Sequence, residues 1–320
     1  MAKQRRFPLT LIAVALLGAA FGGGTASAKA PLCNGSAKLC SKTLDKVVLA
    51  GSHNAMSSKS LGWSIPNHEI PMSTQMKRGI RAMLIDIHYG KPATRIVAGQ
   101  PKAYVHSVGS DDPERRLYLC HAICDIGATP LVEGLTEITK FLKSHPREVM
   151  AFVNEDGVRP SDFAQAVSQS GLQKYVYLGS MTTFPTLSKM IKSGQRAVMM
   201  SESSTAPISW YWRAYDGPLQ ETPYSFATTD LLTAPAQLPI SCRANRGIEG
   251  SPLFLMNHFI TRPPGISRSA DAVVVNTKAA IVNRAKACRT VRGKMPTIIA
   301  VNNVEVGDVV GAAKTLNALR

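Results

Sequence analysis

The sequence lacks the features that usually divide a chain into domains or hold it in a membrane. It has no low-complexity tract, no block of like charges, no Pro- or Ser-rich linker and no internal repeat. Beyond residue 28, no apolar run reaches the roughly 20 residues that a membrane-spanning helix needs. With 45% hydrophobic residues the chain is able to bury a large core, so we expect a single domain over residues 29–320.

Several short motifs with known chemistry are absent as well. No G-x-G-x-x-G and no P-loop accompanies any strand-like run, which argues against an open, doubly wound sheet that binds nucleotides. No C-x-x-C pair is present, which argues against cysteines that bind a metal. No dense run of Lys and Arg alternates with aromatic residues, so nucleic acid is not a favoured partner.

The first 28 residues have the three parts of a secretory signal peptide. Lys3, Arg5 and Arg6 form a basic start, an apolar run follows, and Ala26-Ser27-Ala28 fits the A-x-A cleavage pattern. A membrane anchor is the alternative, but the apolar run is too short for one. We therefore predict cleavage after Ala28 and a mature protein that is soluble outside the cytoplasm, either secreted or in the periplasm or cell envelope.

Six cysteines in an exported chain indicate disulfide bonds. The sequence alone permits fifteen pairings. Proximity along the chain favours Cys33 with Cys40 and Cys120 with Cys124, which leaves Cys242 with Cys288.

The chain is strongly basic, with a formal net charge of +16, of which the signal peptide contributes three charges. Such a charge raises the local concentration of anionic partners, among them an anionic membrane surface and phosphate esters. It does not choose among these partners, and it also favours solubility without any specific partner.

Short apolar runs with little polar alternation indicate strands that are buried on both faces of a parallel sheet. They cover residues 47–52, 82–87, 117–121, 149–154, 197–201, 253–257 and 298–302, with a weaker one near 211–215. Helical periodicity covers residues 73–78, 130–144, 160–170, 184–193 and 270–289. This alternation in one domain predicts a distorted (β/α)8 barrel of the TIM type, in the α/β class.

Residues 89–116 depart from this alternation. The segment TRIVAGQPKAYVHSV contains two extended runs around a Gly-Gln-Pro turn, which predicts a hairpin beside the sheet. The Pro-rich segment around Cys242 is expected to form another excursion, tied to the helix that carries Cys288.

Polar side chains follow the predicted strands where each strand ends. They are His53 and Asn54 on the first, Asp86 and His88 on the second, His121 on the third, and Asn154, Glu155 and Asp156 on the fourth. In a parallel barrel these ends converge on one face, so we expect the side chains to share a pocket. The spacing of His68, His106, His145 and His258 does not single them out.

This combination of histidines and carboxylates suits the cleavage of a phosphodiester. One imidazole takes a proton from the attacking oxygen, and the other gives a proton to the leaving oxygen. Crowded carboxylates repel one another unless a cation lies between them, and Ca²⁺ takes carboxylate and amide oxygens as ligands. A phosphate beside such a cation, flanked by an acid and a base, is the arrangement of a phosphodiesterase site.

The same motifs resemble those of the phosphatidylinositol-specific phospholipase C X-domain-like phosphodiesterases. GSHNAM is similar to the first histidine motif of that family, GIRAMLIDIHYG to its second strand and LYLCHAIC to its second histidine motif. LTEITKFLKSHPREVMAFVNEDGV resembles the helix and strand that follow, and SPLFLMNHF and MPTIIAVNN resemble the last two strands. The resemblance covers most of residues 47–303 and implies a distorted (β/α) barrel.

The resemblance also implies roles for single residues. A neighbouring hydroxyl would attack the phosphorus, with His53 as the general base and His121 as the general acid. Asn54, Asp86 and Glu155 would match the oxygen ligands of the metal in the members that use calcium.

Two positions depart from the family's patterns. Leu84 stands where calcium-dependent members have a further carboxylate, and His88 stands where metal-free bacterial members have an arginine that faces the phosphate. Either Ca²⁺ is held by three protein ligands and water, or a protonated His88 or a nearby arginine partly replaces it. We favour Ca²⁺, because the three oxygen donors together make little sense without a cation.

We therefore expect an exported phosphodiesterase that acts on phosphatidylinositol or a related glycerophosphodiester and releases a cyclic phosphate. One alternative is a hydrolase of a non-lipid phosphodiester. Another is a catalytically inactive barrel that binds a lipid headgroup or a cell-surface glycan, which Leu84 leaves open. Polar residues on later strands are candidates for headgroup contacts, namely Ser201, Glu202, Asn257, His258, Asn302 and Asn303.

Overall fold

The computed structural model describes Met1 and residues 31–203, 208–263 and 265–319. The chain divides into two units, Met1–Pro31 and Leu32–Arg320, and the fold described below is that of the second unit. Apart from Met1, the predicted signal peptide and its cleavage site lie outside the described residues. Among the helices in the described ranges, none has the length and apolar character that crossing a membrane requires.

A curled parallel sheet forms the centre of this unit. Its eight successive strands are β8 (Tyr211–Arg213), β7 (Ala197–Ser201), β6 (Met150–Asp156), β2 (Ala82–Val97), β1 (Leu49–Ser52), β11 (Ile298–Val301), β10 (Leu253–Asn257) and β9 (Leu219–Glu221). Each neighbouring pair on this path is parallel. No pairing among the described residues joins β8 to β9, so the sheet forms a half-barrel. The predicted barrel class is confirmed in this distorted form.

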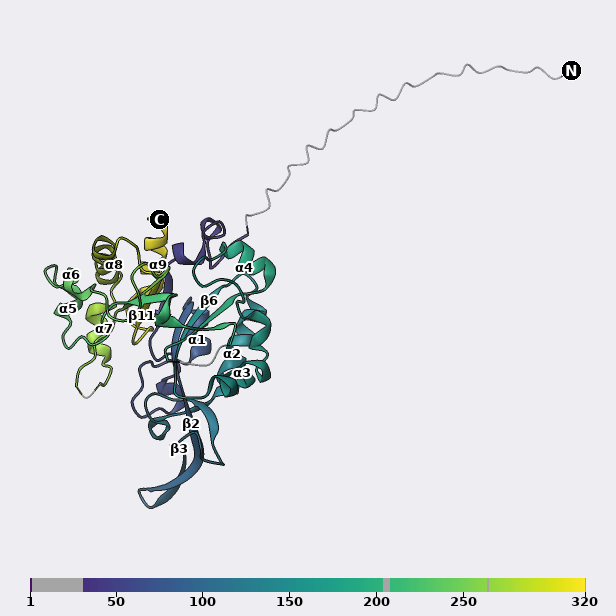
Figure 1. Cartoon of the computed structure of the whole chain (residues 1–320), viewed down its shortest axis with the longest axis vertical. Helices are drawn as coiled ribbons and strands as arrows, with labels where there is room; N and C mark the ends of the chain where they lie inside the picture. Colours follow the sequence, from purple (N-terminus) through teal and green to yellow (C-terminus); the bar gives the residue numbers. More distant parts are fainter. Residues whose placement is uncertain (2–30, 204–207, 264, 320) are drawn as a thin grey trace. The chain divides into compact units, whose positions relative to one another are not determined.

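Helices cover the outer side of the sheet. They are α1 (Met72–Lys77), α2 (Leu131–Ser144), α3 (Pro160–Gln169), α4 (Leu187–Ser193), α5 (Asp230–Thr233), α6 (Leu238–Ser241), α7 (Ser269–Val275), α8 (Lys278–Arg292) and α9 (Val309–Ala318). In Figure 1, α2 to α4 lie on the side of β6, and α7 to α9 lie on the side of β11. The helix predicted over residues 270–289 is two helices, because the Thr277 hydroxyl caps a new helix by accepting from the Ala280 amide.

Side chains along each parallel strand alternate between the inside of the curled sheet and its helix-covered side. Leu49, Ala82, Ala151, Leu253 and Ile298 pack together in one buried cluster. Their neighbours in the sequence, such as Ala50, Met83, Phe152, Phe254 and Ile299, belong to the cluster under the helices. The two-residue period thus determines which side chains point to the inside of the curled sheet at the C-terminal end of each strand.

The prediction of a third parallel strand at residues 117–121 is wrong. This segment forms β4 (Arg116–Leu119), which pairs antiparallel with β2 and with the short β5 (Thr129–Pro130). A buried apolar run carries no information on strand direction, so the sequence pattern did not separate the two cases. The remaining place in the parallel path belongs to β9, whose three residues are too few to form a recognisable apolar run.

The predicted hairpin is present and forms an extension of β2. The second half of β2 pairs antiparallel with β3 (Gln100–Ser107), and the turn contains Ala98 and Gly99, both with positive φ. Figure 1 shows this hairpin projecting away from the sheet and its helices. Because β2 runs on past its parallel neighbours, the hairpin leaves the sheet at the C-terminal ends of the strands.

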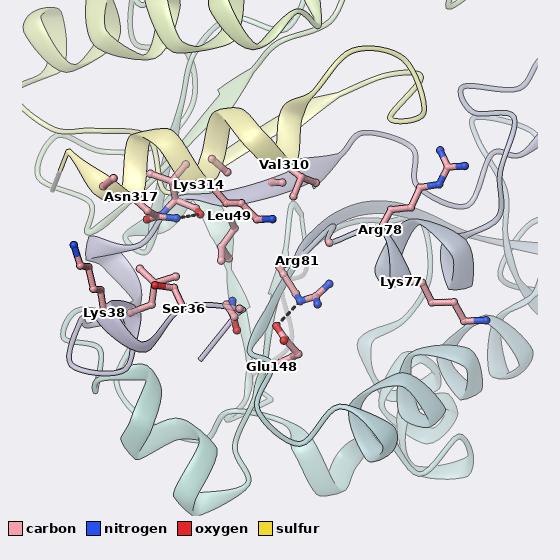
Figure 2. A pocket seen from close by; sticks show the side chains of 18 residues that line it. Ser36, Lys38, Leu49, Lys77, Arg78, Arg81, Glu148, Val310, Lys314 and Asn317 are labelled. Atoms are coloured by element: carbon pink, nitrogen blue, oxygen red, sulfur yellow. Dashed lines mark hydrogen bonds and ion pairs between the residues drawn. The ribbon is translucent and has the colours of Figure 1, made fainter. Parts of the chain in front are cut away.

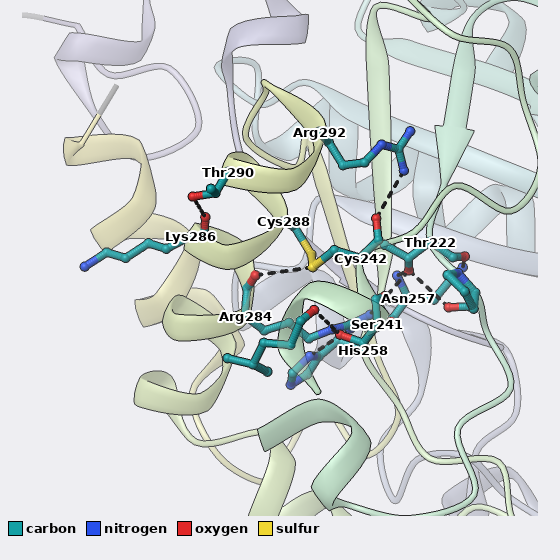
Figure 3. Close-up of a disulfide and its surroundings, with 12 residues drawn as sticks. Thr222, Ser241, Cys242, Asn257, His258, Arg284, Lys286, Cys288, Thr290 and Arg292 are labelled. Carbon is teal, nitrogen blue, oxygen red and sulfur yellow. Dashed lines mark hydrogen bonds between the residues drawn. A yellow bond between two sulfur atoms is a disulfide. The ribbon is translucent and has the colours of Figure 1, made fainter. Parts of the chain in front are cut away.

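All three predicted disulfides are present, joining Cys33 to Cys40, Cys120 to Cys124 and Cys242 to Cys288. Figure 3 shows the third, which ties the segment after α6 to α8. The predicted link between this excursion and the helix of Cys288 is therefore confirmed.

A buried arginine lies one turn before this disulfide on α8 (Figure 3). Arg284 is fully buried, and it donates to Ser241 Oγ and O, each at 2.9 Å, and to the Asn257 carbonyl at 2.5 Å. His258 packs against it. Since Nε2 of His258 donates to the Val275 carbonyl at 2.8 Å, its Nδ1 accepts from Arg284 Nη1 at 3.2 Å. Burial and the charge of Arg284 lower the pKa of His258 to about 3.

We predict that His258 makes the free energy of unfolding fall in acid. Its pKa is about 3 in the folded protein and about 6.5 in an unfolded chain. Below pH 6.5 the unfolded state therefore takes up the proton first, and stability is lost progressively down to pH 3, by about 2 kcal/mol at pH 5.

Urea unfolding at pH 7.5 and pH 5 measures this effect. Between the two pH values, His258→Gln should lose about 2 kcal/mol less than the wild type. The exposed His145 gives the control His145→Gln, which should keep the wild-type pH dependence. An unchanged pH dependence in His258→Gln would contradict the prediction.

Candidate active site

A cavity of about 460 Å³ lies at the C-terminal ends of the parallel strands. The inward positions of the strands continue into it: His53 follows Leu49 and Gly51, Glu155 follows Ala151 and Val153, and Asn302 follows Ile298 and Ala300. The lining residues are His53, Asn54, Asn67, Leu84, His121, Glu155, Glu202, Glu221, Tyr224, Arg246, Asn257, Phe259, Ile260, Thr261, Gly265 and Asn302. Of the eight polar strand-end residues predicted to share a pocket, His53, Asn54, His121 and Glu155 line this cavity.

The two ring nitrogens of His53 have different roles: Nδ1 forms a hydrogen bond within the protein, and Nε2 is left to act as a base. Its Nδ1 lies 2.9 Å from Oδ1 of Asn302, and that oxygen also accepts from Asn67 Nδ2 at 3.1 Å. A carbonyl oxygen only accepts, so Nδ1 carries the proton and Nε2 is the basic nitrogen. The ring stacks on Phe259, with the ring centroids 3.8 Å apart.

The surroundings of His53 keep its imidazole neutral. Burial, together with the nearby His121 and His68, lowers the pKa of His53 to about 3, although the hydrogen bond to Asn302 acts in the opposite direction. His68 also holds the backbone in place, because its Nε2 donates to the His53 carbonyl at 2.8 Å while its Nδ1 accepts from the Val304 amide.

His121 reaches the cavity from a different kind of element. It follows the antiparallel β4 and lies between the disulfide-bonded Cys120 and Cys124. Its Nδ1 donates to Oδ2 of Asp86 at 2.7 Å, and the Asp86 side chain is only 5% exposed. Burial alone would lower the pKa of His121, but the hydrogen bond and charge of Asp86, with the charge of Glu155, outweigh it and raise that pKa.

Three predicted metal ligands lie around this histidine. The Asn54 amide Nδ2 is 3.4 Å from His121 Nε2. Burial raises the pKa of Asp86, and the charge of Glu202 adds to this shift while His121 opposes it. Burial and the charge of Asp86 raise the pKa of Glu155. In the part of the chain that the structure describes, no group of three or more His, Cys, Asp and Glu is arranged to hold a metal ion. The donor set of one amide and two repelling carboxylates fits a hard cation in its chemistry.

A second group of polar residues in the cavity lies around Arg246. Its Nε donates to Glu221 at 2.6 Å and its Nη1 to Glu202 at 2.5 Å. The guanidinium also stacks over the rings of Tyr215 and Tyr224, at 4.0 and 5.1 Å from their centroids. Glu221 is 1% exposed and receives a further bond from Asn257 Nδ2 at 3.0 Å. One cation thus holds two carboxylates in fixed positions.

Some of the predicted residues lie elsewhere. Asn154 and Asp156 occupy the alternate positions of β6 that face the helix-covered side of the sheet. Asn154 donates to Tyr211, and Asp156 accepts from Ser201. His258 belongs to the buried pair with Arg284. His88 and Asn303 do not line the cavity, and burial lowers the pKa of His88, which disfavours the cationic form that a phosphate contact needs. The phosphate contact of His88 stays a prediction.

The sequence analysis missed Arg246, Glu221, Tyr224 and Asn67. Glu221 sits at the inward position of the unrecognised strand β9, so recognition of that strand would have revealed it. Arg246 and Asn67 come from loops, and no spacing in the sequence connects them with the strands that they contact.

The chain is an α/β half-barrel with histidines and carboxylates at the C-terminal ends of its strands. Comparison with known proteins identifies the family within this fold class. The family described as PI-PLC X 1 matches residues 102–317, more than half of the chain. The chain therefore belongs to the PI-PLC X family. The matched region contains His121 and Glu155 and begins after His53.

Relatives of known name agree with this assignment. A PI-PLC X domain-containing protein 1 of Arthroderma benhamiae is 24% identical over 306 residues, which cover 90% of each chain. An uncharacterized secreted protein of the same fungus is 27% identical over 53% of this chain, and the match spans only 35% of that relative. A PI-PLC X domain-containing protein of Arabidopsis thaliana is 21% identical over 74% of this chain and 51% of its own length.

Solved structures share the fold. Two structures of phosphatidylinositol-specific phospholipase C from Staphylococcus aureus superpose with TM-scores of 0.53 and 0.51, at 14% and 17% identity. Each match covers 87% of this chain and 94% or 93% of the other. At this level of identity the likeness shows the barrel fold and nothing finer.

We predict that Arg246→Met lowers the free energy of unfolding by about 3 kcal/mol, because it leaves the buried Glu221 carboxylate without its cation. Arg246→Met combined with Glu221→Gln should recover part of this loss in urea unfolding. Arg213→Met is a matched control, since Arg213 and Asp216 form an ion pair that is 54% and 52% exposed, and it should cost less than about 1 kcal/mol. Equal losses in the two single variants would contradict the prediction.

Proposed function

We propose that this protein is an exported phosphodiesterase that cleaves phosphatidylinositol or a related glycerophosphodiester with two histidines as base and acid. The main observation in support is that their surroundings shift the two pKa values in opposite directions. The pKa of His53 is lowered and that of His121 is raised. A pair of titratable groups whose pKa values are pushed apart in one cavity suits a base and an acid of one reaction.

In this mechanism His53 acts first. With its proton fixed on Nδ1 by Asn302, it presents an unprotonated Nε2 that takes the proton from a headgroup hydroxyl. The hydroxyl oxygen then attacks the neighbouring phosphorus and forms a new P–O bond. The stacking on Phe259 and the hydrogen bond to Asn302 orient the ring, which limits the movement needed to reach the hydroxyl.

His121 completes the exchange of protons. As the bond between phosphorus and the glycerol oxygen breaks, Nε2–H of a protonated His121 gives its proton to that oxygen. The products are a cyclic phosphate and diacylglycerol, with His53 protonated and His121 neutral. Asp86 supports this role because its carboxylate stabilises the imidazolium form and fixes its Nδ1 proton.

The Arg246 group is the best candidate for recognition of the headgroup. Its carboxylates and guanidinium provide fixed acceptors and donors that suit a ring with several hydroxyls. Glu202, Asn257 and Asn302, three of the predicted headgroup residues, line the same cavity. This arrangement favours a polyol headgroup such as inositol over a small, uncharged alcohol.

A calcium ion held by Asn54, Asp86 and Glu155 is the second part of the proposal. The cavity is lined by three carboxylates, Glu155, Glu202 and Glu221, but by one guanidinium, so an anionic phosphodiester would be repelled without a further cation. Bound Ca²⁺ would offset this charge and stabilise the negative charge that develops on the phosphoryl oxygens. Leu84, which lines the cavity, stands in the place of a further ligand, so water or substrate oxygens would complete the coordination.

An anionic membrane surface is the proposed setting for this reaction. The β2–β3 hairpin leaves the sheet on the side of the cavity, and it exposes Ile96 and Val97 by 69% and 45%. Arg95 and Lys102 face each other on the same hairpin. Apolar side chains flanked by cations suit the interface of an anionic bilayer. The disulfides and the secreted fungal relative support export.

We predict that His53→Ala and His121→Ala each reduce the hydrolysis of phosphatidylinositol vesicles by about 10²- to 10⁴-fold. His106→Ala is the matched control, since His106 also bonds to an aspartate, Asp125, at 2.9 Å but is 51% exposed on the hairpin. Its activity should stay within about twofold of the wild type. Full activity of His53→Ala would reject the mechanism.

The substrate panel of this experiment also separates the alternatives. Hydrolysis of a soluble phosphodiester without activity on vesicles would indicate a non-lipid substrate. Binding of headgroup without hydrolysis of any phosphodiester would indicate an inactive barrel.

We predict that a chelator abolishes hydrolysis and that Ca²⁺ restores it. Glu155→Gln should raise the Ca²⁺ concentration for half-maximal activity by about tenfold, because one anionic ligand is lost. Glu114→Gln is the control, since Glu114 is 75% exposed beside Lys91, and it should leave the Ca²⁺ dependence unchanged. Activity that survives chelation would assign the role of the cation to Arg246 or His88.

A further inference from the structure

A second cavity, of about 560 Å³, lies at the opposite ends of the same strands. Leu49 starts β1, Arg81 precedes β2 and Glu148 precedes β6, and all three line this cavity. His53, Asp86 and Glu155 lie at the other ends of these strands. Figure 2 shows the cavity between α9, α1 and the strand starts.

The charge of this cavity is the reverse of that of the candidate active site. It is lined by five basic residues and one acidic residue, namely Lys38, Lys77, Arg78, Arg81, Lys314 and Glu148. Arg81 and Glu148 form an ion pair at 2.6 Å, with both side chains 13% exposed. Among the described residues, the other four basic side chains have no acidic partner. An anion entering this cavity therefore meets an excess of positive charge.

The positions of the basic side chains differ. Figure 2 shows Lys314 and Arg81 extending toward the space between α9 and the strand starts, with Lys38 on the far rim. Lys77 and Arg78 point away from this space in the same view. We therefore assign direct contacts with an anion to Lys314 and Lys38. Arg81, which is paired with Glu148, and the two side chains that point away contribute a longer-range electrostatic effect.

Two neutral polar side chains of the cavity, Asn317 and Asn34, are already used by the fold. The Asn317 amide bridges the Val48 backbone, accepting from its N–H at 2.8 Å and donating to its carbonyl at 2.9 Å. Asn34 bridges the Val149 backbone in the same way, at 2.7 and 3.0 Å. What remains for a ligand is the basic side chains, the Ser36 hydroxyl and an apolar floor that includes the buried Leu49.

We propose that this cavity binds a phosphate monoester. Such a group carries about two negative charges at neutral pH and offers several acceptor oxygens, so it matches several unpaired cations better than a single carboxylate does. The volume lies within the range of small-molecule sites. The phosphate belongs either to a soluble metabolite or to the head of a lipid whose apolar part covers the floor. The site is independent of the catalysis proposed above.

Binding of two probes by calorimetry tests this site and its source of phosphate. Glycerol 3-phosphate represents the soluble source and dioctanoyl phosphatidate the lipid source, and uncharged dioctanoylglycerol is the control ligand. The probe that represents the true source should bind more tightly, and dioctanoylglycerol should not bind. Added salt should weaken binding, since the rim is exposed.

Charge reversal locates the binding. Lys314→Glu and Lys38→Glu should each lower the affinity for the tighter-binding probe by about tenfold or more. Both lysines are exposed and have no acidic partner among the described residues, so the fold should be preserved. Lys140→Glu, on the exposed side of α2, is the matched control and should bind as the wild type does. Equal binding in all three variants, or no binding of either phosphate probe, would overturn the proposal. Because the readout is binding, it does not depend on hydrolysis.

Discussion

The two-residue period of the parallel strands is the constraint on which the rest of the site depends. Small and aliphatic side chains at inward positions, such as Ala82, Ala151 and Ala300, let the sheet curl around a tight interior. Inward positions further toward the C-terminal ends hold Asp86, Glu155 and Asn302. A shift of one residue in any of these strands would turn its polar side chain to the helix side, away from the cavity of the candidate active site.

This period also explains how much of the molecule the sequence alone revealed. The apolar runs located β7 and β10 to the residue, because strands buried on both faces are continuous in apolar character. The polar residues directly after such runs, among them His53, Asp86 and Glu155, were found for the same reason. Residues that reach the cavity from loops have no such neighbour in the sequence, so Arg246 was missed.

Strand direction and long-range contacts could not be predicted from the sequence, and the reason is physical. The apolar pattern of β4 records burial, and burial is the same for a parallel and an antiparallel neighbour. Asn302 was identified only as one of several polar residues, yet its contact with His53 joins positions 249 residues apart. That contact arises because β1 and β11 pair in the sheet, which no local pattern specifies.

Charge is distributed unevenly between the two ends of the strands. The C-terminal end holds Glu155, Glu202 and Glu221 around one guanidinium, whereas the N-terminal end gathers five basic side chains around Glu148. The overall charge of +16 therefore does not describe the candidate active site, which is locally acidic. In the proposed reaction, the net positive charge of the chain would attract anionic surfaces from a distance, and an anionic group at the reacting centre would still require a local cation.

The two histidines depend on different kinds of support. His53 continues a strand that pairs on both sides, so the sheet itself fixes its backbone. His121 lies outside the parallel path, and its position rests on three local contacts: the bond from its ring to Asp86, the bond from the Cys120 amide to the Asp86 carbonyl at 3.2 Å, and the disulfide that encloses it. Asp86 takes part in the first two, so a single strand residue both holds His121 in place and raises its pKa. In the proposed two-histidine site, a residue of a parallel strand thus anchors the histidine that comes from outside the parallel path.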